Sequence, residues 1–217
     1  MTSAQLLAAI AEGMAVTVAL TVLSGLLAVA IALPLGLARA RGPRPLAWPA
    51  AVYVEFFRGT SLLVQLFWLF FVLPLFGVSL PAFATAVLAL GLNYGAYGAE
   101  IVRGAVNSVP RAMHEAASAL ALSRWLAFRK VVLPLALVLL LRPWGTLMVQ
   151  LLKATSLVSL VTVAETTFRA NQLAQLTLDA PRVFGAVLLA YLLLSGCIAG
   201  ATALAAGAVQ RRWALKA

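Results

Sequence analysis

Residues 59–99 read GTSLLVQLFWLFFVLPLFGVSLPAFATAVLALGLNYGAYGA, and no charged residue interrupts them. As one straight helix this stretch would be about 60 Å long, which is twice the thickness of the hydrocarbon core of a bilayer. The chain therefore has to fold back within it, and Pro74, Gly77 and Pro81 place turn-forming residues near its middle. The stretch predicts two membrane-spanning helices joined by a short turn.

Further charge-free segments lie on both sides, at residues 13–38 and 183–210. The whole chain is 64% hydrophobic and 10% charged, whereas soluble domains are about 45–50% apolar and about a quarter charged. We therefore expect an all-α membrane protein that forms a single domain over residues 1–217, with about five transmembrane helices and no room for a large catalytic domain. The predicted spans are residues 14–37, 59–76, 82–102, 131–152 and 183–208.

The formal net charge of +10 would suggest a nucleic-acid partner in a soluble protein. Here the basic residues alternate with charge-free segments, and the positive-inside rule explains this pattern better. We expect the N-terminus outside, the C-terminus in the cytoplasm, and a multi-pass protein of the bacterial inner membrane that contacts lipid and no nucleic acid. The basic residues of the first loop, the third loop and the C-terminal tail are Arg39, Arg41, Arg44, Arg103, Arg111, Arg124, Arg129, Lys130, Arg211, Arg212 and Lys216.

The third loop, about residues 108–134, is longer than a turn requires. Ser108 is suited to cap one short helix and Ser123 a second, in which Trp125 and Phe128 share one side. Two amphipathic helices at the cytoplasmic face need something to cover their apolar sides. Packing against the chain's own helix ends and docking to a cytosolic partner protein fit this pattern equally well.

Residues 115–134 of this loop read EAASALALSRWLAFRKVVLP. The loop resembles the EAA loop of binding-protein-dependent ABC importer permeases. One departure is Ala121, which stands where that loop usually has glycine. A positive φ would cost alanine about 1 kcal/mol or more, so we expect a different turn or a continuous helix here.

The resemblance extends along most of residues 10–212. Residues 54–66, 91–104 and 151–160 resemble the polar amino-acid branch of the same family. Within that branch, the stretches KATSLVS (153–159) and TFRANQ (167–172) look closest to permeases for ectoine and hydroxyectoine.

The resemblance implies a type I importer permease fold and a division of labour between chains. Two cytosolic ATPase subunits would bind and hydrolyse ATP, so this chain would be no enzyme and would hold no cofactor. A second permease subunit, identical or related, would complete the pathway, and an extracytoplasmic binding protein would deliver the solute. The resemblance assigns the coupling loop and its ATPase contacts to Glu115, Ala116, Ala117, Leu120, Ala121, Trp125, Phe128 and Pro134.

The expected solute is ectoine, hydroxyectoine or a similar amino-acid-like compound. A basic or acidic amino acid is the alternative within transport. A membrane scaffold that docks a cytosolic partner without forming a pathway is the alternative of another class.

Polar residues inside the predicted spans are candidates for the solute pathway, because burying them unpaired costs several kcal/mol. Asn93 and Tyr97 share a helix face, where they could line a pathway or form hydrogen bonds between helices. We expect Glu100 and Arg103 to form a local ion pair, with a gate as the alternative. The pathway candidates are Asn93, Tyr94, Tyr97, Glu100, Arg142, Lys153, Thr155 and Ser156.

Three of these candidates leave further alternatives open. Arg142 could snorkel to the interface, pair across a subunit boundary or bind a carboxylate. The hydroxyl groups of Thr155 and Ser156, beside Lys153, could order a re-entrant segment or contact a zwitterion.

The outer loop carries a second set of polar residues. Glu165, Arg169 and Asn171 could face the binding protein, whereas we expect Asp179 to cap the last helix. Cys197 has no partner for a disulfide or a metal site. No catalytic or metal-binding constellation is predicted.

Overall fold

The computed structural model describes residues 3–214, and among them it contains helices and turns but no β-strand. This confirms the all-α class. Side-chain burial is described for residues 8–211. In chain order the elements are α1 (Ser3–Arg41), α2 (Arg44–Gly59), α3 (Leu62–Phe67), the π-helical turn η1 (Trp68–Val72), the 3₁₀ turn η2 (Leu73–Phe76), α4 (Ala82–Asn107), α5 (Arg111–Ala119), α6 (Arg124–Ala127), the π-helical turn η3 (Phe128–Val132), α7 (Leu133–Ala154), the 3₁₀ helix η4 (Thr155–Val161), α8 (Thr166–Thr177) and α9 (Ala180–Ala214).

Three helical stretches are long and apolar enough to cross a membrane: residues 8–41, 124–161 and 180–211. α2 and the segment from α3 to η2 would together make a fourth, although they meet at an angle of 99°. The predicted span 82–102 lies in α4, which is rich in small residues and has much of its surface buried inside the protein. Such a helix needs less hydropathy than one that faces lipid. Five crossings and the sidedness of each end stay predictions.

Two of the predicted span boundaries differ from the structure. The span predicted at residues 131–152 is the middle of a longer helical stretch, 124–161. α7 begins at Leu133 with Pro134 in its first turn, where a missing backbone donor is tolerated, and the π-turn η3 leads into it. The span predicted at residues 59–76 starts three residues before the helical segment, 62–76, which meets α2 at an angle of 99°.

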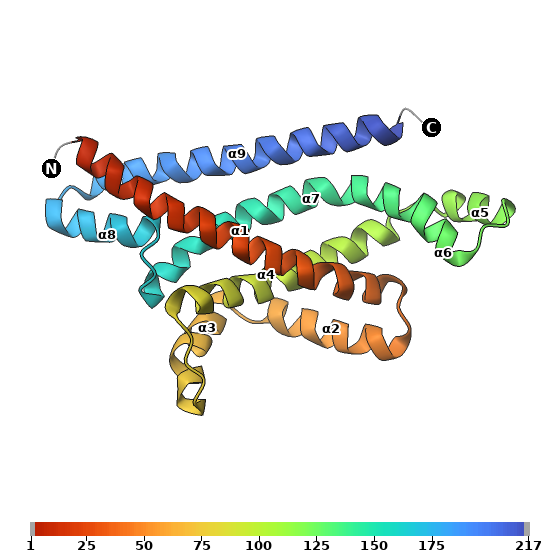
Figure 1. Ribbon diagram of the computed structural model, residues 1–217, viewed down its shortest axis with the longest axis horizontal. Coiled ribbons are helices and arrows are strands. Elements are labelled where there is room, and N and C mark those ends of the chain that lie inside the picture. Colours follow the sequence, from red (N-terminus) through yellow and green to blue (C-terminus); the bar gives the residue numbers. More distant parts are fainter. Residues whose placement is uncertain (1–2, 215–217) are drawn as a thin grey trace.

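α1 and α4 run side by side through the middle of the molecule, with α7 and α9 on one side of them (Figure 1). α8 lies near the start of α1, and α5 and α6 lie at the opposite end. The first described residues of α1 and the last of α9 are at opposite ends of the bundle (Figure 1). This is the arrangement that an odd number of crossings requires.

Glycines in α4 let α1 approach closely. A Cβ atom at Gly91 would lie 2.4 Å from the side chain of Leu27, and one at Gly95 would lie 2.9 Å from Ile31. These two glycines thus have the small-xxx-small spacing that lets two helices approach closely. Gly36 of α1 packs against backbone, because its Cβ would lie 2.6 Å from the carbonyl oxygen of Ala99.

Gly36→Ala is expected to destabilise the bundle by about 1–3 kcal/mol, since backbone atoms cannot move away from the added methyl group as a flexible side chain can. Gly104→Ala is the matched control, because nothing lies within 4 Å of a Cβ at that helical position. It should be neutral or stabilising by up to about 1 kcal/mol. Thermal unfolding in detergent measures both, and equal effects of the two variants would contradict this packing.

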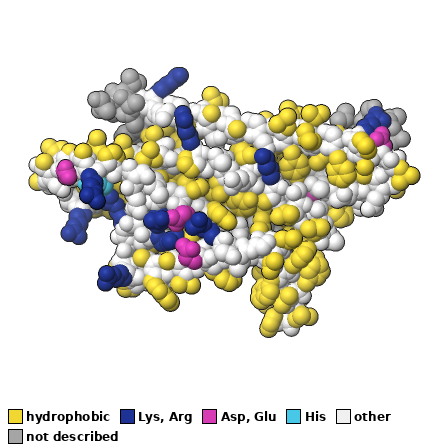
Figure 2. All heavy atoms as spheres, turned by 180° about the vertical axis from the view of Figure 1, so that it is seen from behind, with side chains coloured by type: hydrophobic (Ala, Val, Ile, Leu, Met, Phe, Trp, Pro, Cys, Tyr) yellow, Lys and Arg dark blue, Asp and Glu magenta, His cyan; other side chains and the backbone are white. Residues whose placement is uncertain are grey.

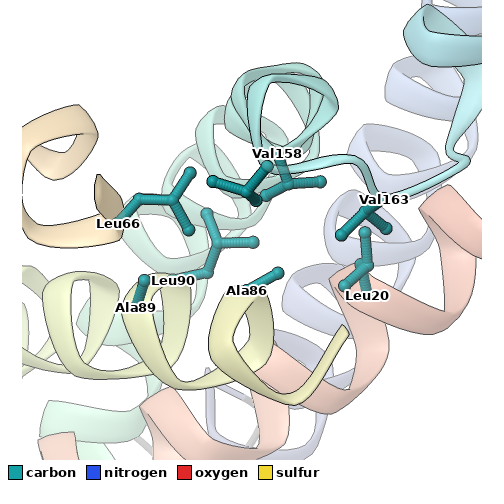
Figure 3. Packing of buried hydrophobic residues seen from close by; sticks show 8 residues of the cluster. Leu20, Leu66, Ala86, Ala89, Leu90, Val158 and Val163 are labelled. Atoms are coloured by element: carbon teal, nitrogen blue, oxygen red, sulfur yellow. The ribbon is translucent and has the colours of Figure 1, made fainter. Parts of the chain in front are cut away.

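At the end of the bundle that holds α8, buried side chains from four elements meet. Leu20 of α1, Leu66 of α3, Leu90 of α4 and Val158 of η4 point toward one another (Figure 3). This cluster anchors the base of the segment α3–η2, whose outer part projects from the body and is covered with hydrophobic side chains (Figure 2).

The break between α2 and α3 frees backbone groups that polar side chains satisfy. The carbonyl oxygen of Phe57 accepts hydrogen bonds from Nδ2 of Asn93 at 3.0 Å and from Nε2 of Gln65 at 3.0 Å. Nδ2 of Asn93 also donates to Oε1 of Gln65 at 3.1 Å. The 99° bend is thus fixed by two amides.

Candidate functional site

The turn that follows α5 is a left-handed helix cap, and Ala121 lies at its centre with φ +50°. The N–H of Ala121 donates to the carbonyl of Ser118 at 2.9 Å, and the N–H of Leu122 donates to that of Ala117 at 3.1 Å. This is the hydrogen-bond pattern of a Schellman motif. The expectation of a different turn or a continuous helix was wrong, because these bonds satisfy carbonyls that the end of α5 would otherwise leave open.

Ala121→Gly is expected to stabilise this turn by up to about 1 kcal/mol, because glycine adopts positive φ without a Cβ clash. The amides of α5 should then exchange with deuterium about fivefold more slowly. Ala119→Gly, at a helical position two residues earlier, should accelerate the same exchange. Faster exchange in Ala121→Gly would show that the positive φ is not the conformation in solution.

The caps of the loop helices are partly as predicted. Ser123 caps α6, since its Oγ accepts a hydrogen bond from the N–H of Leu126 at 3.4 Å. Ser108 does not cap α5. Its N–H donates to the carbonyl of Gly104 at 2.9 Å, so it closes α4, and Pro110 takes the position before α5.

The chain covers only part of the apolar side of this loop. Ala117 and Pro134 are buried and Phe128 is half-buried, whereas Leu120 is 74% exposed and Trp125 is 69% exposed. Packing on the chain's own helices therefore accounts for one side and leaves the other open to a partner. The loop residues exposed on that open surface include Glu115, Ala116, Leu120, Ala121 and Trp125.

Glu100 is the centre of an ion network at the same end of α4. It pairs with Arg103, as predicted, and also accepts a 2.7 Å hydrogen bond from Nη1 of Arg39. Arg39 reaches Glu55 at 3.4 Å as well. The network joins α1, α2 and α4.

The polar residues predicted in the middle of α4 lie in different surroundings. Asn93 is 4% exposed and bonds to the α2–α3 break, which is the interhelical role that the sequence left open. Tyr94 is half-buried beside the core cluster of Figure 3. Tyr97 is 38% exposed and lies under the guanidinium of Arg58, 5.4 Å from the ring centre to Cζ.

A cavity of about 440 Å³ opens between the ends of α7, α8 and α9. Lys153 contributes an ammonium group, and Tyr191 and Ser195 of α9 face it with hydroxyl groups. The Oγ of Ser195 is buried and has no hydrogen-bond partner among the described residues. The cavity is lined by Lys153, Ser156, Thr167, Val187, Leu188, Tyr191, Leu192 and Ser195.

Glu165 lies directly behind this cavity and is fully buried. Its carboxylate accepts hydrogen bonds from the hydroxyl of Tyr191 at 3.0 Å, the hydroxyl of Thr17 at 3.3 Å and the N–H of Phe168 at 2.9 Å. Burial raises the pKa of Glu165, and these donors oppose the rise. The expectation that Glu165 faces the binding protein was wrong, because it caps α8 inside the protein.

Three other residues predicted in this region form hydrogen bonds at helix ends. Thr155 is buried and its hydroxyl donates to the carbonyl of Leu152 at 2.7 Å, while that of Ser156 donates to the carbonyl of Lys153 at 2.8 Å. Both bonds order the end of the helix, yet Ser156 still lines the cavity. Asp179 caps α9 as predicted, accepting from the N–H of Arg182 at 3.3 Å.

Arg142 lines a second cavity between α7 and α9, of about 370 Å³. The two helices touch there, since a Cβ at Gly145 would lie 2.6 Å from the Oγ1 of Thr202. No carboxylate of the described residues pairs with Arg142. Arg142, Thr146 and Lys153 follow i, i+4, i+11 spacing, so one face of α7 carries the polar groups that this helix contributes to both cavities.

Residues 30–213 match the family described as "binding-protein-dependent transport system inner membrane component". The chain belongs to this family. The permease is thus a multi-pass protein of the inner membrane.

The permease is 49% identical over 146 residues to the probable amino-acid ABC transporter permease protein y4tF of Sinorhizobium fredii, a match that covers 64% of this chain and 61% of y4tF. It is 37% identical to the glutamine transport system permease protein GlnP of Escherichia coli, covering 85% of each chain. A crystal structure of an amino acid ABC transporter with histidines superposes with TM-score 0.87 at 29% identity, over 94% of this chain and 98% of that one. The inward-facing MetNI methionine transporter matches with TM-score 0.81 at 24% identity, over 96% and 99%, and supports the fold alone.

Sequence reasoning missed the α9 side of the outer cavity. Tyr191 and Ser195 lie in a long apolar helix without any local motif. A signal was nonetheless present, because two hydroxyl residues four positions apart share a helix face in an otherwise apolar span.

Proposed function

We propose that this permease subunit imports a polar amino acid and that its outer α7–α9 cavity contacts the zwitterionic part of the solute. The chemistry of the cavity carries the proposal. Lys153 supplies a cation for a carboxylate, and the buried hydroxyl of Ser195 lacks a partner that a bound solute would provide. Glu165, behind Tyr191, would favour a cationic amino group nearby.

The position of the two α7–α9 cavities supports a solute pathway rather than a lipid-facing surface. Arg142 and Lys153 are exposed on one face of α7, in or near the membrane. Charged side chains at such depth face other protein or a water-filled cavity, because lipid solvates them poorly. A second permease subunit facing this side of α7 and α9 would enclose both cavities and contribute the other wall of the pathway.

ATP hydrolysis would come from two cytosolic subunits that bind the exposed side of α5 and α6, and an extracytoplasmic binding protein would deliver the solute. Leu120 and Trp125 would fill apolar positions in the ATPase groove, with Glu115 as the charged contact. ATP can drive such a transporter only if the ATP-bound and ATP-free states of the ATPase contact this loop differently.

The relatives favour an amino acid over ectoine. Curated permeases similar to this chain are named for L-cystine and glutamine. Ectoine remains a relevant competitor because it is also a zwitterion. The cavity has room for either solute, since ligand sites of about 300–1,000 Å³ are usual.

Lys153→Met is expected to lower the rate of solute uptake about tenfold in vesicles that contain the complete transporter and saturating binding protein, because one charge-assisted contact is lost. Lys153→Arg should keep most of the rate, and solute binding to the binding protein alone should not change. Competition by glutamine, cystine and ectoine identifies the solute. Full uptake by Lys153→Met would exclude this cavity, and inhibition by ectoine alone would exclude the amino-acid proposal.

A further inference from the structure

A cavity of about 760 Å³ lies at the opposite end of the molecule, between the last turn of α1 and the helices α5 and α6. Arg41 reaches into it from α1, and Arg124 and His114 from the loop. Its remaining walls are mostly apolar. They are formed by Leu37, Ala38, Gly42, Ser118, Leu122, Trp125, Ala127 and Phe128.

No described residue neutralises the charges in this cavity. The ion pairs of the described residues involve Arg39, Arg103 and Arg169, and none of them reaches Arg41 or Arg124. No carboxylate of the described residues lines the cavity. Figure 2 shows basic side chains gathered at this end of the molecule.

Arg41 is held in a position that suits a ligand. Its Nη2 donates to Nε2 of His114 at 3.1 Å, and its Cζ lies 5.6 Å from the ring centre of Phe128. A guanidinium has five N–H donors in a fixed plane, so these contacts orient it and leave donors for an anion.

The level of the cavity identifies the kind of anion. Arg41 is the last residue of one apolar stretch and Arg124 the first of another. Such residues mark the depth at which hydrocarbon gives way to lipid headgroups. Trp125 and Phe128 add aromatic rings at the same level, which is typical of the membrane interface.

The cavity shares Trp125 with the surface proposed for the ATPase, but the two surfaces use different sides of α5. His114 and Ser118 face the cavity from one side of α5, whereas Ala116 and Leu120 lie about 120–160° away around the helix and are exposed. An ATPase subunit bound to that outer side would leave this inner cavity open toward the bilayer.

We propose that this cavity binds the phosphate headgroup of an anionic phospholipid, with Arg41 and Arg124 as its ligands and the apolar wall of α1 against the upper acyl chain. The lipid would bridge the end of α1 and the coupling loop. The bound headgroup would then hold α5 and α6 against the membrane-embedded helices. This inference does not depend on the solute.

The purified full-length permease, titrated with phosphatidylglycerol or phosphatidylcholine of identical acyl chains, tests the proposal by native mass spectrometry. Phosphatidylglycerol should bind at least about tenfold more tightly. Arg124→Gln should reduce its binding about fivefold, since one basic group near a membrane contributes that much. Arg111→Gln, which removes the same charge outside the cavity, should change it less than about twofold.

Ser118→Asp provides a second test that keeps both arginines, because it places a carboxylate in the cavity and should repel the headgroup. Equal losses in Arg124→Gln and Arg111→Gln would show only diffuse attraction and would overturn the proposal. Displacement of the lipid by millimolar inorganic phosphate would assign the cavity to a free anion instead. Loss of the bound lipid when the ATPase subunits assemble would assign it to them.

Discussion

Reversing the charge of Glu115 is expected to separate the permease from its ATPase and to abolish uptake. Glu115 is exposed on α5, and no ion pair among the described residues engages it. In Glu115→Arg a cation would enter a groove that accepts a carboxylate, so attraction is replaced by repulsion. Both co-purification of the ATPase and ATP-dependent uptake into vesicles should fall about a hundredfold.

Glu12→Arg makes the same change of charge near the other end of the molecule. The Glu12 side chain is 68% exposed, and its contact with Arg169 is long, at 3.5 Å. This variant should therefore retain the ATPase. If Glu115→Arg lost the ATPase but kept full uptake, the loop would belong to a scaffold rather than to a driven pathway. If it kept the ATPase, docking would use another surface.

Local signals in the sequence predicted local structure well. The cap of α6 by Ser123, the cap of α9 by Asp179 and the pair of Glu100 with Arg103 all join residues within about four positions of one another. The charge-free segments predicted an all-helical membrane protein for a similar reason, since each span satisfies its own backbone and needs no distant partner.

Contacts between distant segments could not be predicted in this way. The carboxylate of Glu165 meets Thr17 from a helix almost 150 positions earlier, so its position in a polar loop predicted exposure. The bend after α2 depends on Asn93, for which the sequence left both a pathway role and interhelical hydrogen bonds open. At Ala121 the propensity argument predicted a different turn, but two backbone hydrogen bonds outweigh about 1 kcal/mol of strain.

Glu165→Leu is expected to lower the free energy of unfolding by about 3 kcal/mol or more. It would leave the N–H of Phe168 and the hydroxyls of Thr17 and Tyr191 without this acceptor, and each buried unsatisfied group costs about 1–3 kcal/mol. Asp179→Ala is the matched control, since Asp179 also caps a helix but is exposed. This variant should lower the free energy of unfolding by about 0.5–1 kcal/mol. Thermal unfolding in detergent compares the two.

The same carboxylate should make stability depend on pH. Because burial raises the pKa of Glu165 in the folded state, the folded protein binds this proton more tightly than the unfolded chain does. The contribution of Glu165 to stability is complete below its pKa in the unfolded chain, about 4.3. It is lost as the pH rises through the higher pKa of the folded state. Glu165→Gln cannot titrate, so the stability of the wild type relative to this variant should decrease from acid toward neutral pH. A difference that grows with pH would mean that the three donors outweigh burial and that the folded pKa is lowered.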